Sequence, residues 1–205
     1  MSRFIIIEGG IGVGKSTLIN KLKEEFKDAT FIGEYIEEEG GKLMFNMFRS
    51  GKISTEDFQH YILQYWKRKL SYHKKGLFIL ERGPLAGLAF VNALTMKNYN
   101  DFENEILSFM DDMNLNHFKF INTKARMGVE SYTAIINNIK GNLVLFLEAP
   151  PKELLQGVRE RGREGEETYT EEFLRANQDS LHNLYTYYKD ELGIELVNPN
   201  WLFNF

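Results

Sequence analysis

Residues 9–16 read GGIGVGKS, and this segment constrains the fold of the chain more than any other. It matches the pattern G-x-x-x-x-G-K-[ST], which ends here in Lys15 and Ser16. The apolar run Phe4–Ile7 precedes it, and residues with helical spacing follow it. A buried strand, a glycine-rich turn and a helix in this order predict a phosphate-binding loop in an α/β fold with a mostly parallel sheet.

The glycines let the backbone curl so that successive N–H groups point at phosphate oxygens, and the helix N-terminus adds partial positive charge. Lys15 would reach the outer phosphates, and Ser16 would offer a hydroxyl to Mg²⁺. A glycine-rich turn without a ligand is the alternative, which the agreement of motif and context disfavours. We therefore expect ATP or GTP binding. The expected ATP-binding residues of the loop are Gly9, Gly10, Ile11, Gly12, Val13, Gly14, Lys15, Ser16 and Thr17.

Short apolar runs alternate with segments of helical periodicity along the rest of the chain. The alternation predicts three layers, with a mostly parallel five-stranded sheet flanked by helices, in a single domain over residues 1–205. The expected strands are 4–7, 30–33, 77–80, 143–147 and 194–197. The expected helices begin at Lys15 and cover 41–50, 54–75, 101–113, 128–139, 152–160 and 170–190. The polar stretch 122–128 is expected to be a loop.

Composition excludes several classes of protein. There are 25 Lys and Arg against 29 Asp and Glu, a formal net charge of -4, whereas proteins that coat nucleic acid are usually basic. The absence of cysteine excludes a disulfide scaffold, a thiolate nucleophile and Cys-based metal sites. No segment approaches the ~20 apolar residues that cross a bilayer. We expect a cytoplasmic protein (host cytoplasm if the source is viral) with no membrane and no stable nucleic-acid partner.

Charged residues follow two of the predicted strands, at the edge where parallel α/β sheets bind ligands. Glu81 and Arg82 come directly after the strand at 77–80. Arg82 could neutralise a phosphoryl group in transfer, and Glu81 could hold Mg²⁺; a surface ion pair is the alternative. Glu34 follows the strand at 30–33, where it could accept a proton from an attacking hydroxyl. The acidic run 37–39 leaves a solvated loop as the alternative for Glu34.

A third charged segment, RERGREGEE, covers 159–167 near the start of the last long helix. It could be a solvated helix end with local ion pairs. The alternation of Arg159, Arg161 and Arg163, with glycines at 162 and 165, instead favours an arginine lid over 159–168 that binds ATP and excludes water.

These motifs, in this order, resemble the deoxynucleoside kinase family over residues 4–190, and ERGPLAG and R-x-R-x-G-E resemble its herpesvirus-type thymidine kinases. The resemblance implies that Glu34 is the catalytic base and that Lys15 and Arg82 are catalytic. Ser16 and Glu81 would position Mg²⁺. Gln59, in the pair Phe58-Gln59, would bind the nucleobase through its amide, which offers both a donor and an acceptor. The alternatives are that Gln59 is a polar residue on the exposed side of a long helix, or that Gln64 binds the base instead.

The chain departs from the family pattern around the sugar and the base. Phe48 takes the place of a tyrosine that binds the 3′-hydroxyl, and the sugar-binding glutamate of the lid corresponds to Glu166 or Glu167. Gly87 replaces an aspartate near the base, and residues 91–140 fit least well. Phe90, Phe102 and Phe109 are expected to belong to the core. The resemblance assigns substrate binding to Glu34, Phe48, Gln59, Arg82, Glu166 and Glu167.

The sequence thus predicts ATP- and Mg²⁺-dependent phosphorylation of the 5′-hydroxyl of a deoxynucleoside, with thymidine as one candidate. A nucleoside monophosphate kinase resembling thymidylate kinase is the alternative, and a DNA-processing ATPase is a more distant one. The resemblance also implies a homodimer. The expected partners are the nucleoside and ATP.

Overall fold

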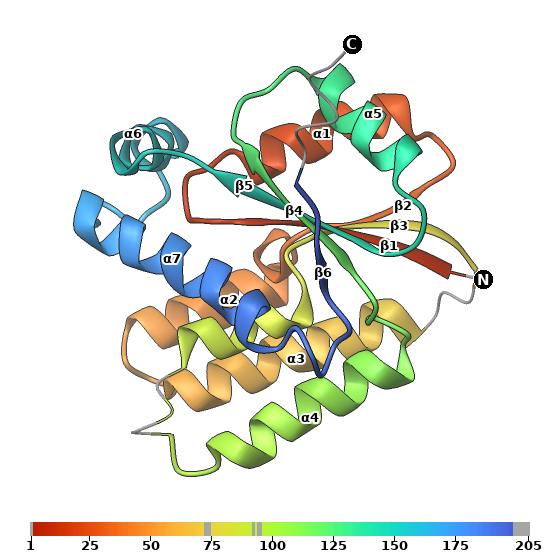
Figure 1. Cartoon of the computed structure of the whole chain (residues 1–205). Coiled ribbons are helices and arrows are strands. Elements are labelled where there is room, and N and C mark those ends of the chain that lie inside the picture. Colours follow the sequence, from red (N-terminus) through yellow and green to blue (C-terminus); the bar gives the residue numbers. More distant parts are fainter. Residues whose placement is uncertain (1, 72–74, 92, 94–95, 199–205) are drawn as a thin grey trace.

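The computed structural model describes residues 2–71, 75–91, 93 and 96–198. In this part of the chain, parallel strands form one sheet in the order β2-β3-β1-β5-β4-β6 (Figure 1). The strands are β1 (Ser2–Gly9), β2 (Thr30–Ile32), β3 (Gly76–Glu81), β4 (Lys119–Lys124), β5 (Leu143–Glu148) and β6 (Glu195–Leu196). The helices are α1 (Lys15–Glu25), α2 (Glu39–Arg49), α3 (Thr55–Ser71), α4 (Tyr99–Asp112), α5 (Val129–Asn138), α6 (Pro151–Arg161) and α7 (Glu171–Tyr187), with short 3-10 helices η1 (Tyr35–Glu37) and η2 (Pro84–Phe90).

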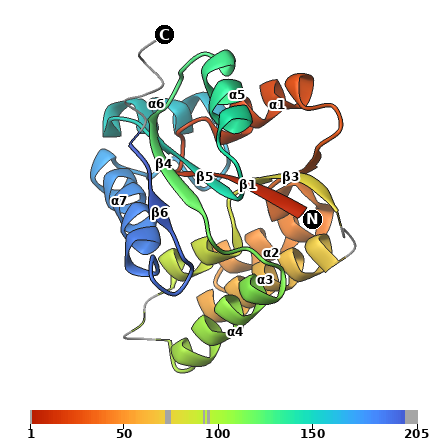
Figure 2. The same ribbon diagram turned by 45° about the vertical axis from the view of Figure 1, so that its right-hand side comes forward.

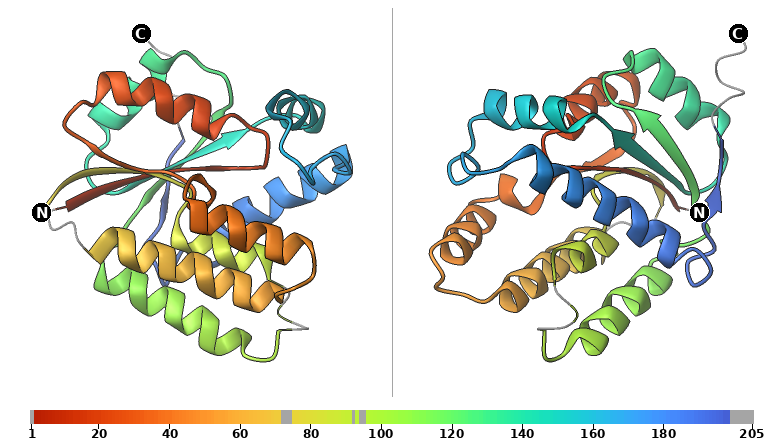
Figure 3. Two further views of the ribbon diagram at one scale, coloured as in Figure 1. Left: turned by 180° about the vertical axis from the view of Figure 1, so that it is seen from behind. Right: turned by 60° about the vertical axis from the view of Figure 1, so that its left-hand side comes forward.

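Helices cover both faces of the sheet, which confirms the predicted layers. Figure 3 shows α1 and α5 on one side, and α2, α3 and α4 on the other. Alternate residues of β1 explain why both faces must be covered. Ile5 and Ile7 are buried in the core under α1 and α5, and Phe4 and Ile6 in the core that includes residues of α3, α4 and α7. A strand that is apolar on both faces is stable only between two layers of helices.

The prediction of five strands was wrong, because the described residues form six. The additional strand is β4, whose second half lies in the stretch 122–128 that we expected to be a loop. The sequence did not predict this strand because Asn122 and Lys124 are polar, although Phe120 and Ile121 are buried in opposite cores. β4 pairs with β5 and β6, so it lies between two strands that follow it in the chain (Figures 1 and 2).

The predicted helices all occur, with ends that shift by a few residues. The start of α3 has reciprocal capping, because Ser54 Oγ accepts from the Asp57 N–H at 3.0 Å and donates to Asp57 Oδ2 at 2.7 Å. α3 is described as far as Ser71, and 72–74, over which the expected helix continues, lie outside the described residues. None of the helices in the described ranges has the length and apolar character that crossing a membrane requires.

Candidate active site

The carboxyl ends of three adjacent strands bring the predicted charged residues together. The phosphate-binding loop follows β1, Glu34 follows β2, and Glu81 ends β3, in the sheet order β2-β3-β1. The Tyr65 hydroxyl of α3 donates to the Gly33 carbonyl at 2.7 Å and so holds the backbone that precedes Glu34. Parallel strands bind ligands at this edge, so the geometry supports a single site.

Close packing against α6 and α7 fixes the shape of the phosphate-binding loop. Gly12 has φ +82°, and a Cβ there would lie 2.2 Å from the Leu154 carbonyl oxygen. A Cβ on Gly157 of α6 would lie 2.0 Å from the Gly12 carbonyl oxygen. The Ile11 N–H donates to Asn177 Oδ1 of α7 at 3.2 Å. Two helices therefore hold the loop in the curled form that phosphate binding requires.

Lys15 is 5% exposed and lies inside the loop. Its ammonium donates to the carbonyl oxygens of Gly10 at 3.0 Å and Gly9 at 3.3 Å. Burial lowers the pKa of Lys15 to about 8; Arg82 acts in the same direction, and nearby carboxylates oppose it. The charge of the loop therefore depends on pH within an accessible range.

We predict that ATP binding weakens as the pH rises through about 8. The ammonium form of Lys15 attracts phosphate, and this form is lost above its pKa, so Kd should rise by up to about tenfold per pH unit. Bound phosphate would favour the charged form, so binding near pH 8 should take up a proton. Calorimetry in two buffers with different ionisation enthalpies measures both effects. A Kd that stays constant from about pH 7 to about pH 9.5 would contradict the prediction.

A buried ion-pair network surrounds Arg82. Its Nη1 lies 2.6 Å from Glu8 Oε1 and its Nε lies 3.4 Å from Glu34 Oε1. Glu8 is fully buried and also accepts from the Gly9 N–H at 3.0 Å and the Tyr185 hydroxyl at 3.4 Å. Arg82 itself has φ 67°, an unfavourable conformation for a residue with a side chain. This cluster fixes a guanidinium between the loop and Glu34.

Glu34 lies among cations. Burial opposes its ionisation, but Arg82, Lys15, Arg163 and Arg161 together hold the pKa of Glu34 below its usual value. Arg163 Nη1 from the lid lies 3.8 Å from Glu34 Oε2. The carboxylate is therefore ionised at neutral pH and can accept a proton.

The predicted lid lies across the site and contacts it through Glu166. This carboxylate is 5% exposed and pairs with Arg161 at 2.5 Å and with Arg163 at 3.7 Å. On the outer side, Arg49 at the end of α2 donates to the Gly165 carbonyl oxygen at 2.6 Å. The lid thus joins the strand-end cluster to α2.

Ser16 and Glu81 form a pair of oxygen ligands beside the loop. Ser16 Oγ donates to Glu81 Oε1 at 2.6 Å, and Glu81 is 2% exposed. Burial and the Glu34 carboxylate raise the pKa of Glu81, although Lys15 and the Ser16 hydroxyl act against this. A nearby cation would stabilise the ionised form of a buried carboxylate whose pKa is raised by a second carboxylate.

Two cavities meet at this cluster. One, of about 430 Å³, is here called the aromatic cavity, and its aromatic lining residues are Tyr35, Phe45, Phe48, Phe58, Trp66, Phe90, Tyr169 and Phe173. The other, of about 580 Å³, is here called the loop cavity and is lined by residues 12–18, Lys21, Arg126 and Gly157, among others. Glu81 and Arg161 line both cavities. The arrangement can therefore hold two molecules with their reacting ends at one point.

The structure brings most of the predicted site residues to these cavities. Glu34, Phe48, Gln59, Arg82, Arg163 and Glu166 line the aromatic cavity, while Lys15, Ser16 and Thr17 line the loop cavity. Of the predicted loop residues, Ile11 lines the aromatic cavity, Gly12, Val13 and Gly14 line the loop cavity, and Gly9 and Gly10 contribute the carbonyl groups that Lys15 contacts. Arg159 and Glu167 are exposed and line neither cavity, so Glu166 is the lid carboxylate that reaches the site.

Gln59 projects into the aromatic cavity although it belongs to a long helix. It is 4% exposed, and its Oε1 is buried without a hydrogen-bond partner in the described structure. A buried amide oxygen without a partner is costly, so it indicates a ligand that donates a hydrogen bond there. Gly87 lies opposite, because a Cβ on it would be 3.5 Å from Gln59 Oε1.

Sequence reasoning missed several residues of the site. Glu8 is part of an apolar strand, and nothing in the sequence shows that its carboxylate holds Arg82. Phe90 packs against the core, as expected, but it also lines the aromatic cavity, and its ring centroid lies 5.6 Å from Arg82 Cζ. Phe102 and Phe109 are core residues, as predicted. Phe90 is the last residue of η2, and the path of this short 3-10 helix places it at the cavity, which the apolar pattern of the sequence does not predict.

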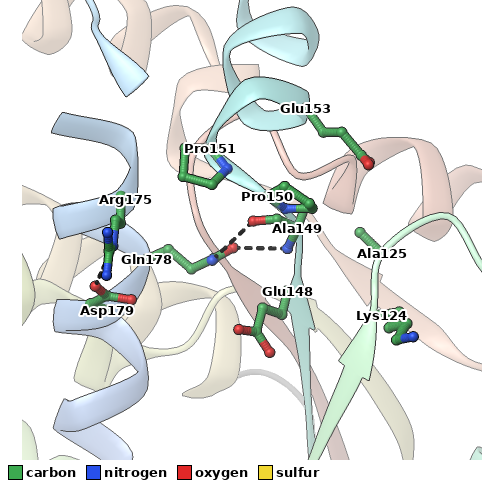
Figure 4. A pocket seen from close by; sticks show the side chains of 10 residues that line it. All are labelled: Lys124, Ala125, Glu148, Ala149, Pro150, Pro151, Glu153, Arg175, Gln178 and Asp179. Carbon is green, nitrogen blue, oxygen red and sulfur yellow. Dashed lines mark hydrogen bonds and ion pairs between the residues drawn. The ribbon is translucent and has the colours of Figure 1, made fainter. Parts of the chain in front are cut away.

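A third cavity, of about 650 Å³, lies at the ends of β4 and β5 beside α6 and α7 (Figure 4). Gln178 of α7 crosses to Ala149, where its Oε1 accepts from the backbone N–H and its Nε2 donates to the carbonyl oxygen, both at 3.1 Å. The side chain thus pairs with the backbone as a strand would. This pairing fixes the turn from which α6 starts, so Gln178 has a structural role at this edge of the cavity.

Comparisons with known proteins agree on a class of nucleotide enzymes. The family model described as deoxynucleoside kinase matches residues 5–192. A thymidylate kinase of Campylobacter jejuni (strain 81-176) is 24% identical over 200 residues, which cover 95% of this chain and 89% of that protein. A deoxyadenosine kinase from M. mycoides, solved with bound dATP, has a TM-score of 0.63 and 17% identity over 97% of this chain and 91% of the other. A second structure of that kinase, with dCMP and a flexible dCDP, has a TM-score of 0.55, 17% identity, and coverage of 96% and 90%.

Proposed function

The chain belongs to the deoxynucleoside kinase family, and on this basis we propose how its two cavities divide the reaction. ATP, the phosphate donor of the family, occupies the loop cavity, and a deoxynucleoside occupies the aromatic cavity with its 5′-hydroxyl next to Glu34. The observation that supports this assignment is that Glu81 and Arg161 line both cavities. Transfer requires the outermost phosphate and the hydroxyl to meet at one point.

In the proposed reaction, Glu34 accepts the proton of the 5′-hydroxyl as the oxygen attacks the γ-phosphorus of ATP. The new O5′–P bond forms while the bond between the γ-phosphorus and the β,γ-bridging oxygen breaks, so that ADP leaves. Its low pKa keeps Glu34 ionised before the reaction. A positioned carboxylate of this kind contributes about 10²- to 10⁴-fold to the rate.

Four basic side chains stabilise the charge on the transferring group. Lys15 reaches the outer phosphates from the loop, and Arg82 is held in place by Glu8. Arg161 and Arg163 come from the lid, where Glu166 pairs with both. Fixed cations in a site that excludes water stabilise developing charge without reorganisation. Because Arg159 and Glu167 lie outside both cavities, we assign them no contact with substrate.

Mg²⁺ fits the oxygen donors beside the loop. The Ser16 hydroxyl and the Glu81 carboxylate lie 2.6 Å apart, and Mg²⁺ commonly binds one or two protein oxygens together with phosphates and water. When bound, the ion would neutralise charge on the phosphates of ATP. Ser16 and Glu81 would hold it, and the loss of repulsion between Glu81 and Glu34 favours its binding.

The charges at the acceptor end favour a nucleoside over a nucleoside monophosphate. Arg82 and Arg163, which face the position of the 5′ group, are each paired with carboxylates. A 5′-phosphate there would add a second anion next to Glu34 and Glu166 and would compete with the outermost phosphate of ATP for the same two arginines. A neutral hydroxyl needs the base that Glu34 supplies, whereas a monophosphate is already ionised.

Gln59 is the residue that we assign to the nucleobase, with the stacked rings of Phe48 and Phe58 beside it. We predict that Gln59→Ala raises KM for the nucleoside about ten- to 100-fold, because the base loses paired hydrogen bonds in a buried site. KM for ATP should change less than about twofold. Gln64→Ala is the matched control, since Gln64 lies exposed on the same helix. Equal effects of the two substitutions on the nucleoside KM would contradict the assignment.

A panel of acceptors tests the function itself. Labelled phosphate from ATP is offered to thymidine, deoxycytidine, deoxyadenosine and deoxyguanosine and to their 5′-monophosphates, with and without Mg²⁺. We expect a nucleoside to be phosphorylated in the presence of Mg²⁺, with thymidine among the candidates. Exclusive transfer to a monophosphate would support the alternative of a thymidylate-type kinase.

The organisation of the whole protein stays a prediction. We propose one kinase domain over residues 1–205, a homodimer and a cytoplasmic location, in line with the family resemblance. Size-exclusion chromatography with light scattering measures the oligomeric state, and a mass of about one chain would contradict the dimer.

A further inference from the structure

The turn between β4 and α5 carries an arginine into the loop cavity. Arg126 lines this cavity together with Met127, although its segment is the part of the chain that fits the family pattern least well. Its φ is 63°, in the left-handed region that few side-chain-bearing residues adopt. Two hydrogen bonds fix the turn: Ala125 N–H to the Glu148 carbonyl at 2.8 Å, and Tyr132 hydroxyl to the Lys124 carbonyl at 2.8 Å. A constrained backbone thus holds Arg126 at the cavity.

The order of the strands places Arg126 at the far end of the loop cavity from the point of transfer. Glu81, which marks that point, ends β3, whereas Arg126 follows β4. Three strand spacings separate β3 from β4 in the sheet, which is about 14 Å. A nucleoside triphosphate in this cavity would have its outermost phosphate near Glu81 and its other phosphates on the loop. Its base would therefore lie toward β4.

We propose that Arg126 binds the base of the donor nucleotide by stacking its guanidinium on the ring. This inference rests on the proposed function, because it takes ATP to be the molecule in the loop cavity. A planar, weakly hydrated guanidinium stacks well on aromatic rings, and a purine offers a large face. Gly157 and Glu160 of α6 line the same cavity and bound the space for the ring.

Arg126 is free to exchange its present partner for the nucleotide. Its Nε lies 3.8 Å from Glu153 Oε2, and the two side chains are 50% and 44% exposed. An ion pair that is exposed to this degree is weak, so little is lost when the guanidinium turns to a base. The acceptor site does not depend on this contact, because Arg126 does not line the aromatic cavity.

Calorimetric titration of the whole protein with ATP tests the proposal without any measurement of turnover. Arg126→Ala should raise Kd for ATP about five- to 20-fold, in the range of a desolvated cation–π contact. Lys124→Ala is the control, because it removes one positive charge from the end of β4, two residues before Arg126, but lines only the third cavity. The Kd of this variant for ATP should match that of the wild type. Arg126→Gly, which accepts the left-handed backbone, should behave like Arg126→Ala and guards against a folding defect.

Inorganic tripolyphosphate separates the base from the phosphates. Its Kd should be the same for the wild type and Arg126→Ala, because it has no base. An unchanged Kd for ATP in both variants, or an equal loss of tripolyphosphate affinity, would overturn the inference. Wild-type protein that binds ATP but phosphorylates no acceptor would instead overturn the proposed function, so the two failures are distinguishable.

Discussion

Glu34→Gln should reduce kcat for nucleoside phosphorylation by about 10²- to 10⁴-fold, the range for loss of a positioned general base. The substitution keeps the shape of the side chain but removes the acceptor of the 5′-hydroxyl proton. Kd for ATP should stay within about threefold of the wild type, because Glu34 lines the aromatic cavity and not the loop cavity. Rapid-quench kinetics and ATP titration measure the two quantities separately.

The acidic run that follows Glu34 provides the control for this variant. Glu38 pairs with Lys69 at 2.5 Å on the surface and does not line either cavity. Glu38→Gln should therefore leave kcat unchanged. If Glu34→Gln retained wild-type turnover, Glu34 would not be the catalytic base, and its carboxylate would serve only to pair with Arg82 and Arg163.

Arg82→Ala should cost both activity and stability. The variant leaves the Glu8 carboxylate fully buried without its cation, and breaking a buried pair in this way costs about 3–5 kcal/mol. For a chain of this size, the loss corresponds to a fall in Tm of roughly 6–20 °C. The rate should fall because the transferring phosphoryl group loses a fixed cation. Thermal unfolding and transfer assays below the new Tm measure the two effects.

A second substitution separates the two roles of Arg82. Glu8→Gln in the Arg82→Ala background removes the unpaired charge, so Tm should rise again while kcat stays low. Arg68→Ala provides the surface comparison, because Arg68 lies 3.9 Å from Glu38 in an exposed pair that is worth at most about 1 kcal/mol. Recovery of activity together with stability in the double variant would remove Arg82 from catalysis and leave it a structural role.

The fold could be predicted where the apolar pattern of a segment matches the burial of that segment in the structure. β1 is apolar on both faces, and the loop after it has few alternative conformations, so one segment predicted the class of the fold. β4 failed because it is half polar: Asn122 donates to Glu148 Oε2 at 2.8 Å instead of packing in a core. A strand whose end carries polar contacts to its neighbour resembles a loop in the sequence.

The site was predictable where residues follow strand ends and not where the chain folds back. The positions of Lys15, Glu34 and Glu81 follow from the order of the strands in the sheet. Phe90 depends on the path of η2, and Arg126 on a turn whose strand was not recognised. Single residues of the lid also could not be assigned from sequence, because alternating charges look the same whether they face the site, as Glu166 does, or solvent, as Glu167 does.

The contact between Gly12 and Gly157 limits where the lid can pivot. Since a single methyl group would not fit between the two backbones, α6 up to Gly157 cannot tilt without distorting the phosphate-binding loop. At the other end, the Thr170 hydroxyl accepts from the Phe173 N–H and fixes the start of α7. We expect the proposed lid to open only in the segment between these anchors, in which Gly162 and Gly165 have positive φ. We therefore expect ligand exchange to involve this segment rather than a whole helix pair, and a longer segment between the same anchors should alter exchange rates while leaving the binding surfaces intact.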